Sequence, residues 1–282
     1  MFLLPSYPRS NTKSKAERHL ISVGGPASNA AVTAAYLGAE VDLFTPIGEH
    51  PLAAYVRDDF QRQRVRVLDP VANQDRSPVF ASIVTSAEQG ERTVVSYHPE
   101  EKLVSSDAVF FDCSLYRVAL FDGFHLEAAV PIAKRCRDAG TLTILDGGSW
   151  KKNLEELLPY IDVAVCSADF SVPDGKDRDA VFGYLRNCGV SMTAITRGEQ
   201  SILYEIEDRA GEIPVPVVDA VDTLGAGDVF HGAVAFYLAD GLAFDVALAE
   251  AARVAARSCA SFGTRDWMVA STSAKTDLSG TK

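Results

Sequence analysis

The sequence lacks the features that define several classes of protein. Its five cysteines form no CxxC pair, its five histidines form no cluster with zinc-ligand spacing, and no run of 18 apolar residues occurs. Scattered cysteines, odd in number, indicate free thiols in a reducing compartment, and a structural metal is not expected. The missing apolar run excludes a transmembrane helix, and residues 1–5 are too short for a signal peptide and lack its basic start. We therefore expect a cytoplasmic protein.

Basic residues are also scarce, since 27 Lys and Arg face 38 Asp and Glu for a net charge of −11. This balance argues against a general nucleic-acid or membrane-surface binder, although it permits a local basic pocket for phosphates. No G-x-x-x-x-G-K-[ST] motif occurs, which excludes a P-loop kinase. The 282 residues, 47% of them apolar, are sufficient for one large α/β domain with a sizeable core.

Short apolar runs alternate with helical segments from about residue 117 onward. The runs 118–121, 142–145, 163–166 and 192–196 read as strands, and a helical segment precedes or follows each of them. Strands that alternate with helices predict a parallel sheet covered on both faces. The stretch 65–98 differs because it holds three short β-like runs, which predict either a small accessory sheet or an ordinary surface hairpin.

The most informative stretch is VDTLGAGD at 221–228, which an apolar helical run follows at once. Gly225, Ala226 and Gly227 bring backbone N–H groups to the start of a helix, where unsatisfied donors and the helix dipole hold an anion. Asp228 beside such a site is suited to accept a proton from a nucleophile next to a bound phosphate. The plainer interpretation is a helix start with two capping aspartates. The complete octet favours transfer of a phosphoryl group to a hydroxyl.

A second glycine motif, GGPASNAA, begins at Gly24 and opens a helix of small residues. Gly24 and Gly25 allow the backbone to approach a ligand closely, and Asn29 offers the donor and the acceptor that sugar hydroxyls need. A dinucleotide site is the alternative, since the acidic Glu40 follows the helix. Its G-x-G-x-x-G spacing fails because Pro26 stands at the second glycine.

Together these motifs resemble the two signatures of the ribokinase-like (PfkB) carbohydrate kinases, and the resemblance covers about residues 5–266. It implies a three-layer α/β/α fold with a central, mostly parallel sheet and a small β-sheet lid, formed here by about 5–23 and 65–98. The kinase domain would span 1–270, and a disordered tail would follow at 271–282. The resemblance also implies ATP and Mg²⁺ as cofactors, K⁺ as in many members, a small-molecule sugar as substrate, and a homodimer through the lid.

The resemblance assigns roles to individual positions. The catalytic base is Asp228, and the backbone at Gly225, Ala226 and Gly227 stabilises the transferring phosphoryl group. The substrate-binding positions are Gly24, Gly25, Asn29 and Gly48. The nucleotide-binding turn is Thr196, Arg197 and Gly198, where a plain turn after a strand is the alternative for Arg197. The metal positions are Asp222 and the Leu224 carbonyl for a monovalent cation, and Asp146 near the phosphates, where helix capping is the alternative.

Two departures from the family pattern bear on function. Members begin with a buried strand whose aspartate binds sugar hydroxyls, and residues 4–8 resemble the segment just after it, so that strand would lie upstream of Met1 or be missing. Ser167 and Phe170 stand where the family has Asn-x-x-Glu, which organises Mg²⁺ and phosphate. Ketohexokinases and sulfofructose kinases relax the same motif, which favours a ketose as acceptor. A nucleoside kinase and a non-catalytic sugar-binding relative remain the alternatives.

Overall fold

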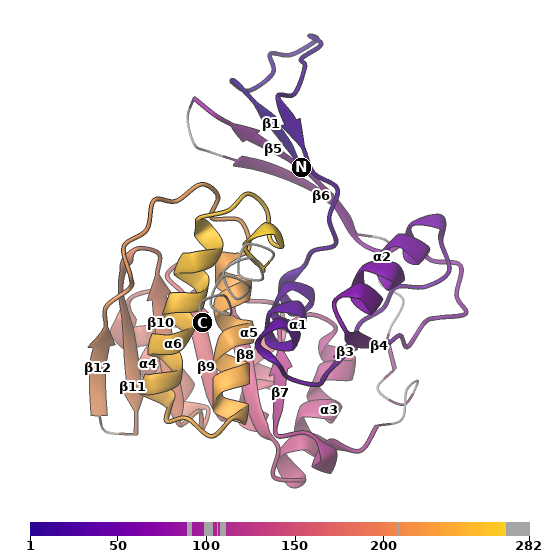
Figure 1. Ribbon diagram of the computed structural model, residues 1–282. Coiled ribbons are helices and arrows are strands. Elements are labelled where there is room, and N and C mark those ends of the chain that lie inside the picture. The colour runs from indigo at the N-terminus through magenta and orange to yellow at the C-terminus, as the bar shows by residue number, and fades with distance from the viewer. Residues whose placement is uncertain (89–91, 99–103, 106, 108–110, 208, 269–282) are drawn as a thin grey trace, which may run out of the picture.

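A six-stranded sheet forms the centre of the computed structural model, which describes residues 1–88, 92–98, 104, 105, 107, 111–207 and 209–268 (Figure 1). In spatial order its strands are β12 (Arg209–Ile213), β11 (Gln200–Ile206), β10 (Met192–Arg197), β9 (Val163–Ser167), β8 (Leu142–Gly147) and β7 (Val118–Phe121). Strands β7 to β10 are parallel, and β11 and β12 are antiparallel additions at one edge. This confirms the predicted central, mostly parallel sheet.

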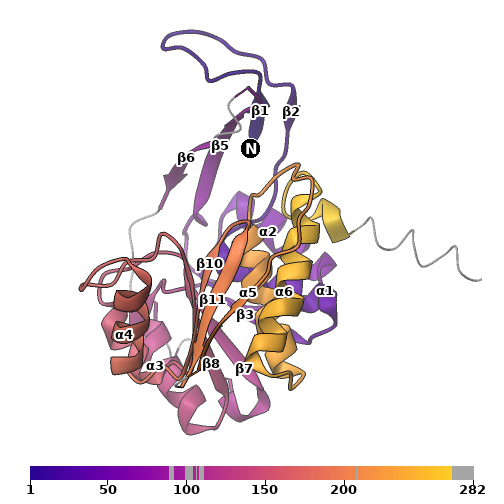
Figure 2. The ribbon, with the colours of Figure 1, turned by 90° about the vertical axis from the view of Figure 1, so that its left-hand side faces the viewer.

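Helices cover both faces of this sheet, so the molecule has three layers (Figure 2). One face carries α3 (Leu126–Asp138) and α4 (Arg178–Asn187), and the other carries α5 (Ala226–Ala239) and α6 (Phe244–Cys259). Neighbouring residues on β9 enter different cores, since Ala164 packs on the α3 and α4 side while Val165 packs on the α5 and α6 side. A strand that is buried on both faces needs apolar residues at successive positions. The apolar run 163–166 is the pattern from which the sequence predicted β9.

Short 3-10 turns complete the α3 and α4 side of the molecule. They are η1 (Cys113–Leu115), η2 (Leu154–Glu156) and η3 (Leu158–Tyr160).

No helix in the described part of the chain is long and apolar enough to cross a membrane.

The glycine motif at Gly24 leads into α1 (Pro26–Leu37), which packs along α5 (Figure 1). The two helix backbones approach closely, because a Cβ placed on Gly232 of α5 would stand 2.3 Å from the Ala30 carbonyl oxygen. After α1, the strand β3 (Val41–Phe44), the helix α2 (Pro51–Arg62) and the strand β4 (Val65–Leu68) form a βαβ unit whose two strands pair in parallel.

This unit corrects one expected boundary of the lid. Residues 65–68 do not join the lid sheet but pair with β3, because Val65 packs with Phe60 of α2 and Leu43 of β3 in one buried cluster. Burial of Val65 in this cluster places β4 beside β3, although β4 is close to the lid strands in the sequence.

The lid is a four-stranded sheet in the order β2 (Arg18–His19), β1 (Phe2–Leu4), β5 (Phe80–Ser86) and β6 (Arg92–Tyr97). It stands apart from the three-layer body, beyond the carboxyl ends of the central strands (Figure 1). Its amino-terminal part differs from the expected 5–23, since β1 lies before residue 5 and only two residues of that stretch form a strand. The expected tail at 271–282 lies outside the described residues.

Candidate active site

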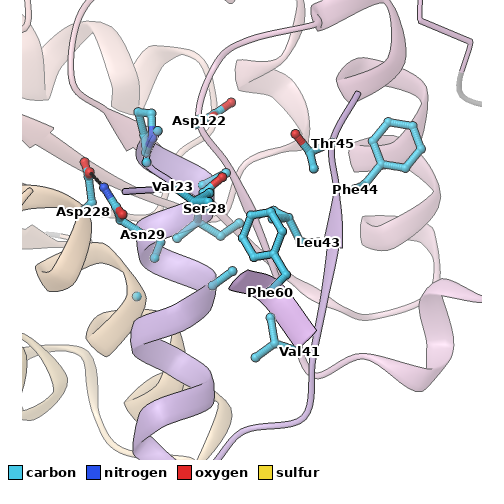
Figure 3. A pocket seen from close by; sticks show the side chains of 18 of the residues that line it. Val23, Ser28, Asn29, Val41, Leu43, Phe44, Thr45, Phe60, Asp122 and Asp228 are labelled. Carbon is cyan, nitrogen blue, oxygen red and sulfur yellow. Dashed lines mark hydrogen bonds between the residues drawn. The ribbon is translucent and has the colours of Figure 1, made fainter. Parts of the chain in front are cut away.

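Polar side chains from three elements lie near one another at the carboxyl edge of the central sheet (Figure 3). Asn29 lies in the first turn of α1, Asp228 lies in the first turn of α5, and Asp122 directly follows β7. Asn29 donates from Nδ2 to Oδ2 of Asp228 over 2.7 Å, although 199 residues separate the two along the chain. The two glycine motifs of the sequence therefore form one site.

The start of α5 is shaped by Gly225, which has a left-handed backbone with φ 73°. A Cβ at this position would lie 2.7 Å from Cγ2 of Thr264, so no other residue fits without displacing the loop after α6. The N–H of Ala226 donates to the Thr223 carbonyl oxygen over 3.3 Å. The N–H groups of Gly227 and Asp228 lie in the first turn, where a helix supplies no acceptor, and they are available to an anion.

Burial dominates the electrostatics of the acidic residues. It raises the pKa of Asp228 above its ordinary value, and the hydrogen bond from Asn29 opposes the rise. Burial likewise raises the pKa of Asp122, and it raises the pKa of Asp146 to about 6, where His231 lowers it and the charges of Asp228 and Asp122 add to the rise. Three carboxyl groups that share one poorly solvated edge each make ionisation of the others more costly.

His231 connects α5 to the sheet beneath it. Its Nδ1 lies 2.7 Å from the Gly227 carbonyl oxygen, and its Nε2 lies 3.0 Å from the Val165 carbonyl oxygen. The same Nδ1 is 3.4 Å from Oδ2 of Asp146, a buried oxygen that has no hydrogen-bond partner among the described residues. The site thus contains a carboxylate oxygen with free capacity for a donor or a cation.

Arg265 supports Asn29 from the side opposite Asp228. Its Nη1 donates to Oδ1 of Asn29 over 3.2 Å, and its Nη2 lies 3.4 Å from Oδ2 of Asp59. Burial lowers the pKa of the Arg265 guanidinium, and the charge of Asp59 opposes this effect. Because both ends of the Asn29 amide are engaged, its orientation is defined and its Nδ2 faces Asp228.

Sequence reasoning missed four residues of this region, namely Asp122, Arg265, His231 and Arg76. Asp122 had an accessible signal, because an acidic residue directly after a predicted parallel strand is expected at the ligand edge. Arg76 is buried and lines the cavity described next, and its Nη1 has no partner among the described residues. Nothing in the local sequence around Arg265 or Arg76 distinguishes either from an ordinary surface arginine.

A cavity of about 1360 Å³ opens beside Asn29 and Asp228. Among the expected site residues, those that line it are Gly24, Gly25, Asn29, Leu224, Gly225 and Asp228. Gly48 does not line it. Gly48 has φ 77°, and a Cβ there would stand 2.7 Å from the Arg76 carbonyl oxygen. Its place in the structure is explained by close packing against the backbone of the Arg76 segment.

The predicted nucleotide-binding turn lies on the hairpin between β10 and β11. Arg197 donates from Nε and Nη2 to the Ser201 carbonyl oxygen at 2.8 and 2.6 Å, and Thr196 donates from Oγ1 to the Cys166 carbonyl oxygen at 3.3 Å. Gly198 adopts φ 62° in the turn itself. These residues share the carboxyl edge of the sheet with Asp146, but in this structure the Arg197 guanidinium stabilises its own hairpin.

Asp222 also has a structural task. Its Oδ1 accepts a hydrogen bond from the N–H of Leu224 at 3.0 Å, and its Oδ2 accepts one from the N–H of Gly263 at 2.9 Å. These bonds connect the loop before α5 to the loop after α6.

In the part of the chain that the structure describes, no group of three or more His, Cys, Asp or Glu side chains is arranged to hold a metal ion.

Comparison with known proteins agrees with this arrangement. Residues 4–270 match the family described as pfkB family carbohydrate kinase. The chain is 27% identical over 264 residues to the aminoimidazole riboside kinase of Salmonella typhimurium, covering 87% of this chain and 82% of that protein. It is 25% identical over 258 residues to the ribokinase of Bacillus subtilis, covering 87% and 84%. The crystal structure of a ribokinase from Thermotoga maritima has the same fold, with a TM-score of 0.76, 20% identity and coverage of 96% and 95%. The chain belongs to the PfkB family of carbohydrate kinases and is a phosphotransferase that acts on a hydroxyl group.

Proposed function

We propose that this chain transfers the γ-phosphoryl group of ATP to a hydroxyl group of a ketose, with Asp228 as the general base. The observation that carries the proposal is the 2.7 Å hydrogen bond between Asn29 and Asp228, which both line the cavity, beside the first-turn amides of α5. It combines a proton acceptor and an anion site in the first turn of α5 with an oriented polar partner from α1.

In the proposed step, Asp228 takes the proton of the acceptor hydroxyl while that oxygen attacks the γ-phosphorus. The bond from the γ-phosphorus to the β,γ-bridging oxygen breaks, and ADP leaves with the bonding electron pair. Burial supports this role because it raises the pKa of Asp228 toward the working pH, where a carboxylate is a stronger base. Asn29, held by Arg265, keeps the carboxylate in place.

Charge that develops on the phosphoryl oxygens would be met by the amides of Gly227 and Asp228 and by the dipole of α5. Mg²⁺ bound to ATP neutralises phosphate charge in reactions of this class. Asp146 fits the task of holding that ion, because its buried Oδ2 has no partner among the described residues. Asp222 fits a monovalent cation poorly, since both of its oxygens already accept backbone N–H groups, and we derive no step through such an ion.

The preference for a ketose rests on the altered Asn-x-x-Glu region. Phe170, which stands at the glutamate position, is 1% exposed and packs against Trp150, so an aromatic core residue replaces a phosphate-side carboxylate. Ser167 donates from Oγ to the Gly148 carbonyl oxygen at 2.9 Å. The second candidate is a nucleoside as acceptor, which the similarity to an aminoimidazole riboside kinase supports.

The test is ADP release from ATP and Mg²⁺ with a panel of ketoses, aldopentoses, sulfofructose and nucleosides. We expect turnover with a ketose, and we expect Asp228→Asn to lower it by about 10²–10⁴-fold. Turnover confined to nucleosides would replace the first candidate by the second. A folded protein that binds a sugar but releases no ADP with any acceptor would refute both and identify a non-catalytic sugar-binding relative.

A further inference from the structure

Arg76 is a buried arginine whose charge has no partner in the described part of the chain. The residue is 8% exposed, and its Nη1 lies out of contact with solvent without a hydrogen-bond acceptor. No carboxylate of the described residues forms an ion pair with it. A guanidinium removed from water is strongly disfavoured unless an anion or a set of acceptors compensates its charge. The side chain therefore fits a site that a ligand completes.

Asp69, the buried carboxylate of the adjoining segment, is bound by other donors. Its Oδ1 accepts a hydrogen bond from the N–H of Ile47 at 3.1 Å, and its Oδ2 accepts one from the N–H of Gly48 at 3.1 Å. Its Oδ2 also accepts a hydrogen bond from Nη2 of Arg57 at 2.6 Å. Because Arg57 compensates the charge of Asp69, this carboxylate does not compensate Arg76.

The backbone of Arg76 is held in place by close packing. A Cβ on Gly48 would stand 2.7 Å from the Arg76 carbonyl oxygen and 2.9 Å from the Arg76 Cβ, so the two segments are in direct contact. Pro78 has a fixed φ and limits the backbone that leads from Arg76 into β5. A charged group on a fixed backbone loses less conformational entropy on binding a ligand than one on a mobile loop does.

Arg76 shares the cavity with Asn29 and Asp228, since all three line it. It adjoins the loop that directly follows β3. Thr45, the first residue of that loop, lies on the same side of the pocket as Asp122, which directly follows β7 (Figure 3). Arg76 is therefore at the carboxyl edge of the strands, where ligands of α/β sheets bind.

The other arginine that lines the cavity, Arg117, is placed and bound differently. It directly precedes β7, at the opposite end of that strand from Asp122, and its Nη1 donates to the Ala239 carbonyl oxygen at 3.0 Å. No lysine of the described residues lines the cavity. Because an arginine is charged at any working pH, Arg76 is the permanent positive charge that a ligand bound near Asp228 can use.

We propose that the acceptor sugar carries an anionic group on a carbon other than the one that is phosphorylated, and that Arg76 binds this group and selects for it. The inference rests on the proposed function, since it keeps Asp228 at the reacting hydroxyl of the same ligand. The substrate class is a ketose with a carboxylate, a sulfonate or a phosphate ester at its far end.

The chemistry of the guanidinium favours an anion over a neutral sugar end. Its planar fork donates two parallel hydrogen bonds to a pair of oxygens on a carboxylate, sulfonate or phosphate group. A hydroxyl group can accept one such bond, but it leaves the buried charge uncompensated. The carboxyl groups of Asp122, Asp146 and Asp228 also repel an anion at this edge, so an anionic acceptor needs a nearby cation.

The first experiment measures binding without turnover. Asp228→Asn, with Mg²⁺ and a non-hydrolysable ATP analogue, is titrated calorimetrically with D-fructose and with three analogues that differ from it at C6. These are D-fructuronate, 6-deoxy-6-sulfofructose and D-fructose 6-phosphate, and they distinguish a carboxylate, a sulfonate and a phosphate. We expect at least one of them to bind about 30-fold or more tightly than fructose, as for a buried charge pair with hydrogen bonds.

Substitutions of Arg76 in the same background assign the selectivity. Arg76→Gln should reduce the affinity for the preferred anion to that for fructose, and Arg76→Lys should retain part of it, because lysine keeps the charge without the planar fork. Arg76→Gln should unfold at the same temperature as its parent or at a higher one, since it removes an uncompensated buried charge. The matched control is Arg62→Gln, which makes the same change at an exposed ion pair with Asp58 and should leave all affinities unchanged.

Kinetics of the chain with Asp228 intact give a second readout. Arg76→Gln should lower kcat/KM for the anionic acceptor by about 30-fold or more through KM, with kcat little changed and fructose unaffected, because the contact is made equally in the ground state and the transition state. Selective binding without ADP release would refute the proposed function alone. Equal affinity for fructose and all three analogues, no binding of any of the four, selectivity that survives Arg76→Gln, or an equal loss of fructose affinity in that variant would each overturn the role of Arg76.

Discussion

Replacing Asp228 by asparagine separates the chemistry of the site from its architecture. The amide has nearly the shape of the carboxylate, and its oxygen can still accept the 2.7 Å hydrogen bond from Asn29 Nδ2. Burial raises the pKa of Asp228, which means that the folded protein pays to hold the charged form. A neutral amide avoids that cost, so Asp228→Asn should unfold at the same temperature as the unmodified chain or at a higher one.

The catalytic effect should be large because the amide cannot accept the hydroxyl proton. Loss of a positioned general base lowers kcat by about 10²–10⁴-fold, which corresponds to roughly 2.7–5.4 kcal/mol in the activation barrier. The pH profile carries a second signature. The base acts only when deprotonated, so activity of the unmodified chain falls as the pH drops through the raised pKa of Asp228, and the variant should lack this acid limb.

The assay is initial-rate ADP release at saturating ATP and Mg²⁺ with the acceptor that the substrate panel identifies, from pH 4.5 to pH 9. Asp179→Asn is the matched control, because it makes the same change in the first turn of α4 at an exposed ion pair with Arg178. The control should retain full activity. A folded Asp228→Asn variant with turnover within tenfold of the unmodified chain would refute the role of Asp228 as base.

Three further predictions test the surroundings of the site. Asn29→Ala removes the hydrogen bond that lowers the pKa of Asp228, so the acid limb of the pH–rate profile should move to higher pH; an unmoved limb would contradict the contact. Gly225→Ala should lower the free energy of unfolding in urea by about 1–3 kcal/mol, because Gly225 has a φ of 73° and a Cβ there would clash with Thr264. Gly183→Ala is the control: Gly183 lies in α4 with open space around its Cβ position, so the change should be neutral or stabilising by about 0.5–1 kcal/mol. Asp146→Asn tests the pKa of Asp146, which burial raises to about 6. Between about pH 4 and pH 6 the native state holds the carboxyl proton that the unfolded chain has lost. The free energy of unfolding of the unmodified chain is therefore highest below about pH 4 and falls as the pH rises to about 6. The variant should remove this fall and gain up to about 3 kcal/mol at pH 8 relative to pH 4, and a pH-independent effect would count against the raised pKa.

Much of the fold was predictable from local patterns. The largely apolar runs 118–121, 142–145, 163–166 and 192–196 each fall within a strand of the parallel sheet, because helices cover both faces of that sheet. The helix after the octet also begins where the glycines predicted it, at Ala226. Patterns of this kind arise from interactions between residues that are close in sequence, or from the burial of a whole segment, which requires mostly apolar residues along it.

Other features were not accessible because they depend on the packing of distant segments. Residues 65–68 look like the other lid strands, and only the cluster that they share with Phe60 directs them to β3. Gly48 has the sequence context of a ligand loop, yet its neighbours are the backbone atoms of Arg76 and Gln74. Arg197 could reach a phosphate or its own hairpin, and the Ser201 carbonyl decides between them in this structure.

The sequence by itself determined the fold class, the family and the position of the phosphoryl-transfer motif, because helix starts, strand burial and glycine turns are encoded over short distances. Only the tertiary structure decided how the site is assembled. The Asn29 amide lies between Asp228 and Arg265, at separations of 199 and 236 residues along the chain. Contacts of this range form when helices and sheets pack to bury apolar surface, and no local propensity specifies which polar groups that packing brings together.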